Sequence, residues 1–236
     1  MSLPAGVIDL GLVRRVALRP PRSAAPLAVA SVTALAGLGL DGDRHAAPLS
    51  PRQLLLADAH AYAEHGLAPG ALRENLLLDV DIGALASGSL LRVGPSVVLR
   101  VMFPCEACGR LNVARAGLAG VIGGQRGLLV RVLRGGAIAP GHRVGLLAAR
   151  LPPWPFDWRP RIDMILTAMP PGHVIDYGQL AQVGGIPSGY CRAFPRAIAA
   201  LGPAHAGRAL TQRCRTNQPR WLGQGLFDAE LAAIDL

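Results

Sequence analysis

The chain has 236 residues, of which 51% are hydrophobic and 4% aromatic, and it carries a formal net charge of +9. This length suits one large domain or two small ones, and the apolar content excludes an intrinsically disordered chain. All 24 basic residues are arginine, and no apolar run reaches the length of a membrane span. We therefore expect no membrane partner. Because no basic region followed by an apolar core opens the chain, we expect a cytoplasmic protein with four reduced cysteines.

The first 150 residues alternate short apolar runs with turns that contain Gly and Asp, a pattern typical of β-strands. The predicted strands are Val7–Leu18, Leu27–Leu35, Leu90–Val93, Val97–Phe103, Gly127–Leu133 and His142–Leu147. A helix is predicted over Pro51–His65 with Ser50 as its N-cap, a shorter one over Val113–Gly120, and a turn over Ala137–Gly141. Many short strands at close spacing indicate a β-barrel with a few helices.

The sequence changes character near residue 150. Residues 151–160 contain four prolines and two tryptophans, which predicts a stiff linker that the tryptophans dock onto a domain. Helices are predicted over Arg161–Ala168, Tyr177–Val183 and from Ser188 to about Leu201, with a Gly-containing turn before the last. This order is typical of a helix-turn-helix. We therefore expect a first domain over residues 1–147, a linker over 148–160 and a second domain over 161–236.

The two parts differ in charge. Residues 1–150 carry 16 Arg against 9 acidic residues, which suits an anionic small molecule or cofactor. Between Arg159 and Arg220 there are 8 Arg against Asp163 and Asp176, which indicates a local basic surface. Such a surface favours a polyanion.

Two of the four cysteines, Cys105 and Cys108, lie three positions apart and are followed by Arg110. Thiolates bind soft metals, so this segment is a candidate cofactor site. A structural zinc site is an alternative, although zinc needs four ligands and no second Cys or His pair follows. A dithiol redox pair is another, although the strand-to-helix setting of thioredoxins is missing.

The pieces around this pair resemble, as a set, the MOSC domain, which is named for the C-terminal domain of molybdenum cofactor sulfurase. The resemblance covers roughly residues 5–147. The matching pieces are Gly39–His45, Arg52–Leu54, Arg73–Leu76, Leu91–Gly94, Pro104–Asn112 and Val132–Val144. It implies a β-barrel with a cysteine that carries sulfur or binds the molybdenum of a pterin cofactor. Small relatives reduce N-hydroxylated bases and related N-oxygenated compounds.

The resemblance implies a set of site residues. Relatives with Leu-Asn shortly after the cysteine place Cys108 as the metal ligand and catalytic residue, with Cys105 as its neighbour. Charge complementarity, and not the resemblance itself, predicts that Arg44, Arg73, Arg110 and Arg126 bind the phosphate and pterin oxygens of the cofactor. Asn75 is predicted to hold a ring edge, and His45 is a further candidate for cofactor binding. The expected cofactor is molybdopterin, and pyridoxal phosphate is not expected.

The segments Met169–Ala181 and Pro187–Ala193 resemble the C-terminal domain of O6-alkylguanine-DNA alkyltransferases, which has a winged-helix fold, and the resemblance covers roughly residues 158–225. Those proteins flip a damaged guanine out of the duplex and transfer its alkyl group to a cysteine. The resemblance implies DNA contacts by Tyr177, Gly178, Gln179 and Arg192. The Pro-Cys-His-Arg acceptor motif is missing, because Cys214 lies between Arg213 and Arg215 without an adjacent histidine. The departure resembles the alkyltransferase-like proteins, so alkyl transfer is not expected.

The expected fold is therefore a mainly-β barrel followed by an α-rich winged helix-turn-helix domain. The first functional hypothesis is a molybdenum-dependent oxidoreductase that reduces an N-oxygenated small molecule with electrons from a donor protein. The alternative is a non-enzymatic adaptor that binds duplex DNA with alkylated guanine for DNA repair, with the barrel as sulfur carrier or scaffold. A structural zinc protein is the third hypothesis.

Overall fold

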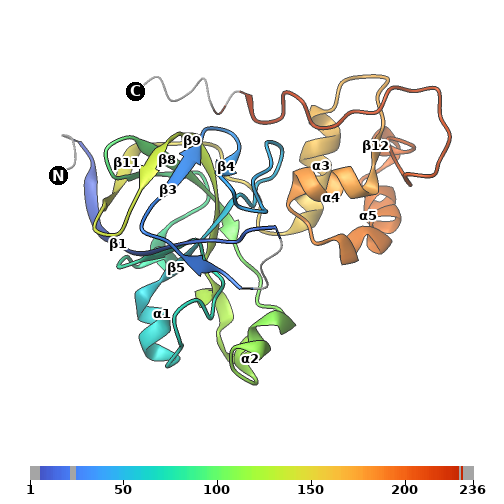
Figure 1. Cartoon of the computed structure of the whole chain (residues 1–236). Coiled ribbons are helices and arrows are strands. Elements are labelled where there is room, and N and C mark those ends of the chain that lie inside the picture. Colours follow the sequence, from blue (N-terminus) through green and yellow to red (C-terminus); the bar gives the residue numbers. More distant parts are fainter. Residues whose placement is uncertain (1–5, 22–24, 229, 231–236) are drawn as a thin grey trace. The chain divides into compact units, whose positions relative to one another are not determined.

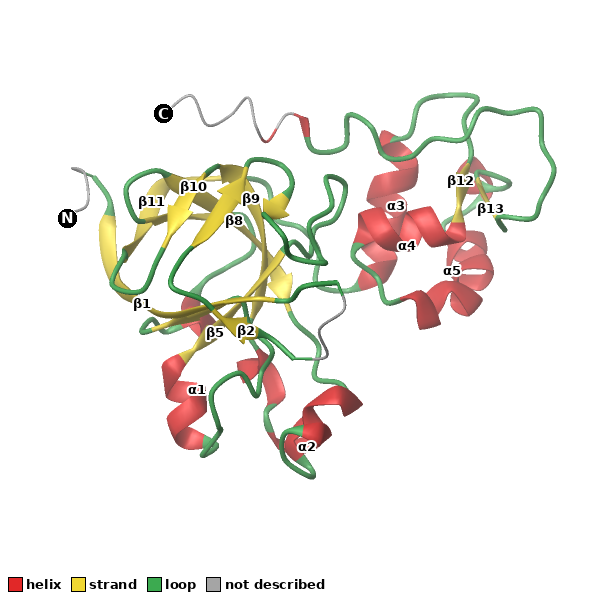
Figure 2. Cartoon of the chain, viewed as in Figure 1, coloured by secondary structure: helices red, strands yellow, loops and turns green. Residues whose placement is uncertain are grey.

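The computed structural model describes residues 6–21, 25–228 and 230 and divides the chain into two units. The first unit comprises residues 1–48 and 52–154, and the second comprises residues 49–51 and 155–236. Figure 2 shows strands concentrated in the first unit and helices in the second. Among the described residues, no helix is long and apolar enough to cross a membrane.

The first unit is a closed β-barrel (Figure 1). Its strands follow the order β11-β7-β8-β9-β5-β6-β1, and β11 pairs with β1 to close the ring, which makes a seven-stranded barrel. All of these pairings are antiparallel except that of β5 with β6. The ring strands are β1 Ile8–Leu18, β5 Leu54–Asp58, β6 Leu76–Leu78, β7 Ser89–Val93, β8 Val97–Pro104, β9 Leu128–Arg134 and β11 Arg143–Arg150.

Smaller elements complete this unit. β2 (Leu27–Ala28) extends the sheet beside β1, and β3 (Val32–Leu35) lies between β4 (Gly39–Leu40) and β10 (Gly136–Ile138) in a separate small sheet. The helices are short, and they are α1 Ala59–Glu64, α2 Leu118–Val121 and three 3-10 helices, η1 Ile82–Ala84, η2 Gly109–Val113 and η3 Gly123–Arg126. Figure 1 shows α1 and α2 on the same side of the barrel.

Alternate side chains of each strand fill the barrel. Leu54 and Leu56 of β5 belong to the central cluster with residues of β1, β7, β8 and β9. Ala57, the next residue after Leu56, belongs to a second apolar cluster with Leu72, Leu111 and residues of α1 and α2. Since strands have a period of two, β5 is buried on both faces and reads as a continuous apolar run.

This two-sided burial explains a wrong prediction. The helix expected over Pro51–His65 is a strand, Leu54–Asp58, followed by only six helical residues, Ala59–Glu64. The N-cap is Asp58, whose side chain accepts a hydrogen bond from the His60 amide, and not Ser50. Leu and Ala favour helices, but pairing of β5 with β6 and β9 outweighs that local preference.

Other boundaries also differ. The strand expected over Leu27–Leu35 is two strands, because β2 pairs with β1 whereas β3 pairs with β10. The turn expected over Ala137–Gly141 includes the end of β10, so only its last residues turn. The helix expected over Val113–Gly120 is reduced to α2, preceded by η2.

Two glycines allow close approaches that shape the barrel. Gly11 lies at a register shift between β1 and β11, where a Cβ atom would lie 2.0 Å from the Asp79 carbonyl oxygen. Gly127 has φ +118°, and a Cβ atom there would lie 2.2 Å from the Leu56 carbonyl oxygen. A side chain at either position would clash with backbone, so both positions require glycine.

The second unit is mostly helical. Its helices are α3 Trp158–Ala168, α4 Tyr177–Gly184 and α5 Phe194–Ala200, with 3-10 helices η4 Ser188–Ala193 and η5 Pro203–His205. The predicted third helix is therefore η4 followed by α5. α3 begins at Trp158, three residues earlier than expected, and Asp157 is its N-cap. Its strands β12 (Ile175–Asp176) and β13 (Ala209–Leu210) form a parallel pair. Among the described residues of this unit, that pair does not make the antiparallel hairpin of a wing.

Both tryptophans of the proline-rich segment are packed. The Trp154 amide donates to Ser87 Oγ over 2.8 Å, and its side chain is buried in the first unit. Trp158 is buried in the second unit, with its ring near those of Tyr190 and Phe194. The expectation that the tryptophans dock this segment is confirmed.

Candidate functional site

The candidate site of the first unit surrounds Cys108, which is exposed and immediately precedes η2. Cys105 follows β8 and is buried, and its amide donates to the Gly127 carbonyl over 2.8 Å. This bond ties the cysteine segment to the start of β9. The two thiols therefore differ in access, and only Cys108 is open to a ligand from solvent.

Four of the predicted arginines share one electrostatic environment with Cys108. The pKa of Arg73 is lowered, first by burial and then by the positive charges of Arg44, Arg110 and Arg126, while the Cys108 sulfur acts in the opposite direction. Like charges repel, so a group of arginines at one place favours an anion that neutralises them. The structure thus brings Arg44, Arg73, Arg110, Arg126 and Cys108 together.

Two of these arginines have unusual local structure. Arg73 has φ +58° and is the one described residue other than glycine with a positive φ. Backbone strain of this kind is concentrated at functional sites. Arg126 is buried, its Nη1 donates to the Leu72 carbonyl, and its Nε has no hydrogen-bond partner among the described residues. A buried donor without an acceptor in the protein is available to an acceptor that a ligand supplies.

The residue His45 borders this group. Its pKa is lowered to about 4, first by burial and then by Arg19, with Arg44 and Arg52 in the same direction and Asp43 opposing them. His45 Nε2 lies 3.2 Å from the Nε of Arg44, which can act only as a hydrogen-bond donor. The imidazole is therefore neutral at pH 7 and accepts from Arg44 through Nε2, which assigns its proton to Nδ1.

Asn75 lies behind the site and not in it. It is fully buried, and its Nδ2 donates to Asp43 Oδ2 and the Ala17 carbonyl while its Oδ1 accepts from Arg19 and the Leu55 amide. Both ends of the amide are occupied within the protein. The expectation that Asn75 holds the edge of a cofactor ring is therefore corrected, because this side chain supports the loop that carries Arg44 and His45.

Two residues of this region were missed as site residues in the sequence. Arg19 is buried and donates to Asp43 and Asn75. Arg52 Nη2 lies 3.9 Å from Cys105 Sγ, and its charge acts on His45. Arg52 belongs to the matched piece Arg52–Leu54, which was the available signal. Arg19 directly follows β1 and belongs to no motif, so only the fold could identify it.

No group of three His, Cys, Asp or Glu side chains in the described part of the chain is placed to hold a metal ion. The zinc hypothesis therefore gains no ligand set from the structure. A single exposed thiol among arginines fits a different kind of group, an anionic cofactor that supplies most of the ligands of its own metal.

The predicted DNA-contacting residues lie on α4 and η4 of the second unit. Tyr177, Gly178 and Gln179 form the first turn of α4, and Arg192 is an exposed residue of η4. The Gln179 side chain donates to the Leu222 carbonyl. Tyr177 borders a pocket of about 450 Å³ with Pro195, Ile198 and Ala209 among its lining residues. Burial raises the pKa of Tyr177, and the Cys214 charge acts in the same direction.

A closed seven-stranded β-barrel with short helices defines the fold class of the first unit, and this barrel carries an exposed thiol near clustered arginines. Residues 44–145 match the family model described as the MOSC domain. The first unit therefore contains a MOSC domain, and this part of the sequence-based expectation is confirmed. No curated protein matches the chain.

Solved structures share the fold at low sequence identity. A hypothetical protein is 21% identical with a TM-score of 0.51, and the match covers 81% of this chain and 91% of that one. The YuaD protein from Bacillus subtilis is 18% identical with a TM-score of 0.50, over 58% and 94% of the two chains. YiiM from Escherichia coli is 17% identical, with a TM-score of 0.49 over 83% and 94%.

The match to the hypothetical protein extends into the second unit. A match over 81% of the chain is longer than the first unit, so it includes part of residues 155–236. This likeness is one of fold alone. The alkyltransferase-like assignment of this unit is not shown by the comparisons and stays a prediction.

Proposed function

We propose that the MOSC domain binds the molybdenum cofactor with Cys108 as its protein ligand and reduces N-hydroxylated bases or similar N-oxygenated compounds. The proposal is supported by the exposed thiol of Cys108, which interacts electrostatically with Arg73. Arg73 also interacts electrostatically with Arg44, Arg110 and Arg126. Arginine forks suit phosphate oxygens, and a thiolate suits a soft metal. The orphaned Nε of Arg126 is a donor for the same group.

In this proposal each side chain of the site has a separate task. Arg44, Arg73, Arg110 and Arg126 hold the anionic groups of the cofactor, and Cys108 provides the one ligand from the protein. When bound, the cofactor supplies two-electron redox chemistry at its metal. His45, neutral and with its proton on Nδ1, is a hydrogen-bond donor at the edge of the arginines. An electron-donor protein is the partner that the reduction requires.

Metal and pterin analysis of protein from a cofactor-producing host tests the proposal. We expect near-stoichiometric molybdenum in the wild type and in Cys105→Ala, and negligible molybdenum in Cys108→Ala. Cys214→Ala, in the other unit, is the matched control for an exposed cysteine. Equally negligible molybdenum in the wild type and Cys108→Ala would overturn the proposal. Reduction of an N-hydroxylated base with a chemical reductant then tests the activity itself.

A specific observation supports a second candidate function, recognition of a modified base in DNA by the second unit. The pocket beside Tyr177 offers an aromatic ring and apolar walls, which suit a base taken out of the duplex. Exposed Arg192 provides a cation on the same unit. We expect binding to a duplex with O6-alkylguanine that weakens in Arg192→Ala and with rising salt. No shift of any duplex at low salt would exclude this candidate.

A further inference from the structure

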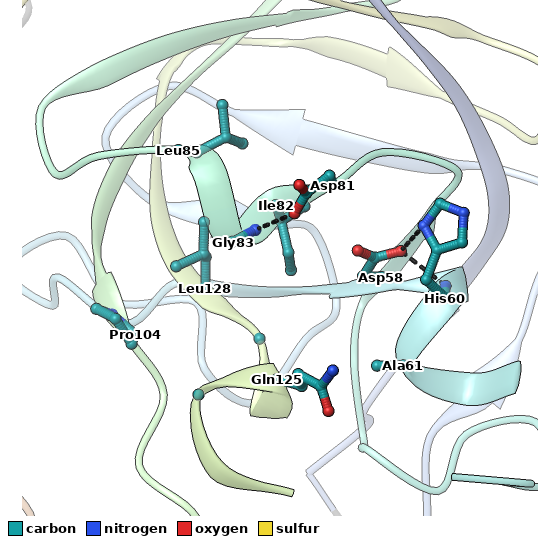
Figure 3. A pocket seen from close by; sticks show the side chains of 12 residues that line it. Asp58, His60, Ala61, Asp81, Ile82, Gly83, Leu85, Pro104, Gln125 and Leu128 are labelled. Atoms are coloured by element: carbon teal, nitrogen blue, oxygen red, sulfur yellow. Dashed lines mark hydrogen bonds and ion pairs between the residues drawn. The ribbon is translucent and has the colours of Figure 1, made fainter. Parts of the chain in front are cut away.

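The first unit contains a pocket of about 580 Å³ at the end of the barrel where β5 and β8 finish and β9 begins. Figure 3 shows its labelled side chains around the pocket, from β5, α1, η1, β8, η3 and β9 and the residues that flank η1. A volume of this size is within the range that drug-sized ligands occupy. The pocket uses none of the residues assigned to the cofactor above.

Its walls are mainly aliphatic. Ile82 and Leu128 belong to the central apolar cluster of the barrel, and Leu85 packs against that cluster. Ala61 and Pro104 add further apolar surface to the lining. Because the floor of the pocket is the barrel core itself, the pocket is a rigid recess that suits an apolar ring or chain.

The charged groups of the pocket are carboxylates. Asp58 and Asp81 line it, and no arginine does, although the chain has 24 basic residues, all of them arginine. Asp58 Oδ1 accepts from the His60 amide at 2.7 Å and lies 3.2 Å from His60 Nδ1. Asp81 Oδ1 accepts from the Gly83 amide at 3.0 Å. Figure 3 marks these contacts, and all of them use Oδ1 of the carboxylates and leave Oδ2 uninvolved.

The geometry points to an organic cation as the ligand of this pocket, a protonated amidine or amine on an apolar body. The apolar recess accommodates the body, and the two Oδ2 atoms accept from the charged nitrogen groups. Charge complementarity favours a positively charged ligand here, because this pocket is lined by two carboxylates and no arginine, although the protein as a whole is basic. The proposal goes beyond the cofactor site and is independent of it.

Both carboxylates also cap short helices, which decides the choice of variants. Asp58 caps α1 and Asp81 caps η1. Asparagine caps a helix about as well as aspartate, so Asp58→Asn and Asp81→Asn remove charge and keep the cap. Asp157→Asn is the matched control, since Asp157 caps α3 of the second unit in the same way.

Benzamidine is the probe, and benzamide is its neutral near-isostere. Binding to the full chain is measured by calorimetry and by methyl chemical shifts. We expect saturable benzamidine binding that shifts the methyl signals of Ile82, Leu85 and Leu128. Affinity for benzamide, and for benzamidine in either pocket variant, is expected to fall about tenfold, as for the loss of a charge-assisted contact of roughly 1.4 kcal/mol. Asp157→Asn is expected to bind as the wild type does.

Three outcomes would overturn the inference. The first is no saturable benzamidine binding at millimolar concentration. The second is equal affinity for benzamidine and benzamide, which shows an apolar recess without charge selection. The third is wild-type affinity in the Asp58→Asn, Asp81→Asn double variant. The wild-type comparison of the two probes needs no variant, and none of these measurements depends on molybdenum.

Discussion

Asn75 Nδ2 donates to Asp43 Oδ2 over 2.7 Å, and both side chains are buried beneath the loop that carries Arg44 and His45. Asp43 Oδ1 accepts in turn from the His45 amide at 2.8 Å, and Arg19 donates to both partners. The pair therefore connects β1, β6 and the loop after β4. It fixes the position of Arg44 and His45 from behind, without contact to a ligand.

Replacing Asn75 by Ala should destabilise the first unit. The change removes one hydrogen-bond partner each from the buried Asp43 carboxylate and the Arg19 guanidinium, for which we expect a loss of roughly 2–4 kcal/mol in the free energy of unfolding. Thermal and urea unfolding measure it. Asn217→Ala, at an exposed position, is the control and is expected to stay within about 0.5 kcal/mol. A loss no larger than that of the control would show that the network is not structural.

Acid should weaken the native state through His45. Its pKa is about 4 in the native state against 6.5 for an ordinary histidine, so the native protein binds fewer protons than the unfolded chain between those values. The free energy of unfolding therefore falls as the pH is lowered from about 6.5 to 4 and is unaffected by this group above 6.5. His45→Gln keeps a hydrogen-bond acceptor for Arg44. Between pH 6.5 and 4 we expect the free energy of unfolding of His45→Gln to fall by on the order of 1–2 kcal/mol less than that of the wild type. The same pH dependence in both proteins would contradict the lowered pKa of His45.

Alkylation should separate the four cysteines by exposure. Cys108 and Cys214 are exposed, Cys191 is half-buried and Cys105 is buried, so iodoacetamide should label the first two first. Pyrophosphate should protect Cys108 and leave Cys214 reactive, because the arginines around Arg73 bind the anion beside Cys108. Peptide mass spectrometry follows each site. Labelling of Cys105 as fast as Cys108 in the folded protein would argue against the arrangement.

Arg161 should be a large contributor to the stability of the second unit. It is buried, its Nε donates to the Pro155 carbonyl at 2.7 Å, and its Nη1 donates at 3.0 Å to the carbonyl of Gly184, the last residue of α4. We expect Arg161→Met to cost roughly 3–5 kcal/mol, since it leaves buried carbonyls without donors. Unfolding of that unit, followed by circular dichroism, measures the loss. Arg159→Ala, at an exposed position, is expected to change little, and equal effects of the two would refute the role of Arg161.

Several features of this chain could be predicted from the sequence because they depend on local pattern. Short apolar runs identified β1, β7, β8, β9 and β11, and the helix predicted over Tyr177–Val183, before a Gly-containing turn, corresponds to α4. The spacing of Cys105, Cys108 and Arg110 and the order of the surrounding pieces indicated a MOSC domain, which the match over residues 44–145 confirms. Such signals are carried by neighbours in the chain.

Only the tertiary structure decided the rest, because it depends on which distant segments meet. β5 is a strand through pairing with β6 and β9, against the helical preference of its own residues. Folding gave Cys105 and Cys108 different solvent exposure. It also removed Asn75 from the cofactor-binding residues, because hydrogen bonds within the protein occupy its side-chain amide. The sequence did not predict that Asp58 and Asp81 line one pocket, because strand pairing and barrel closure bring these two residues together.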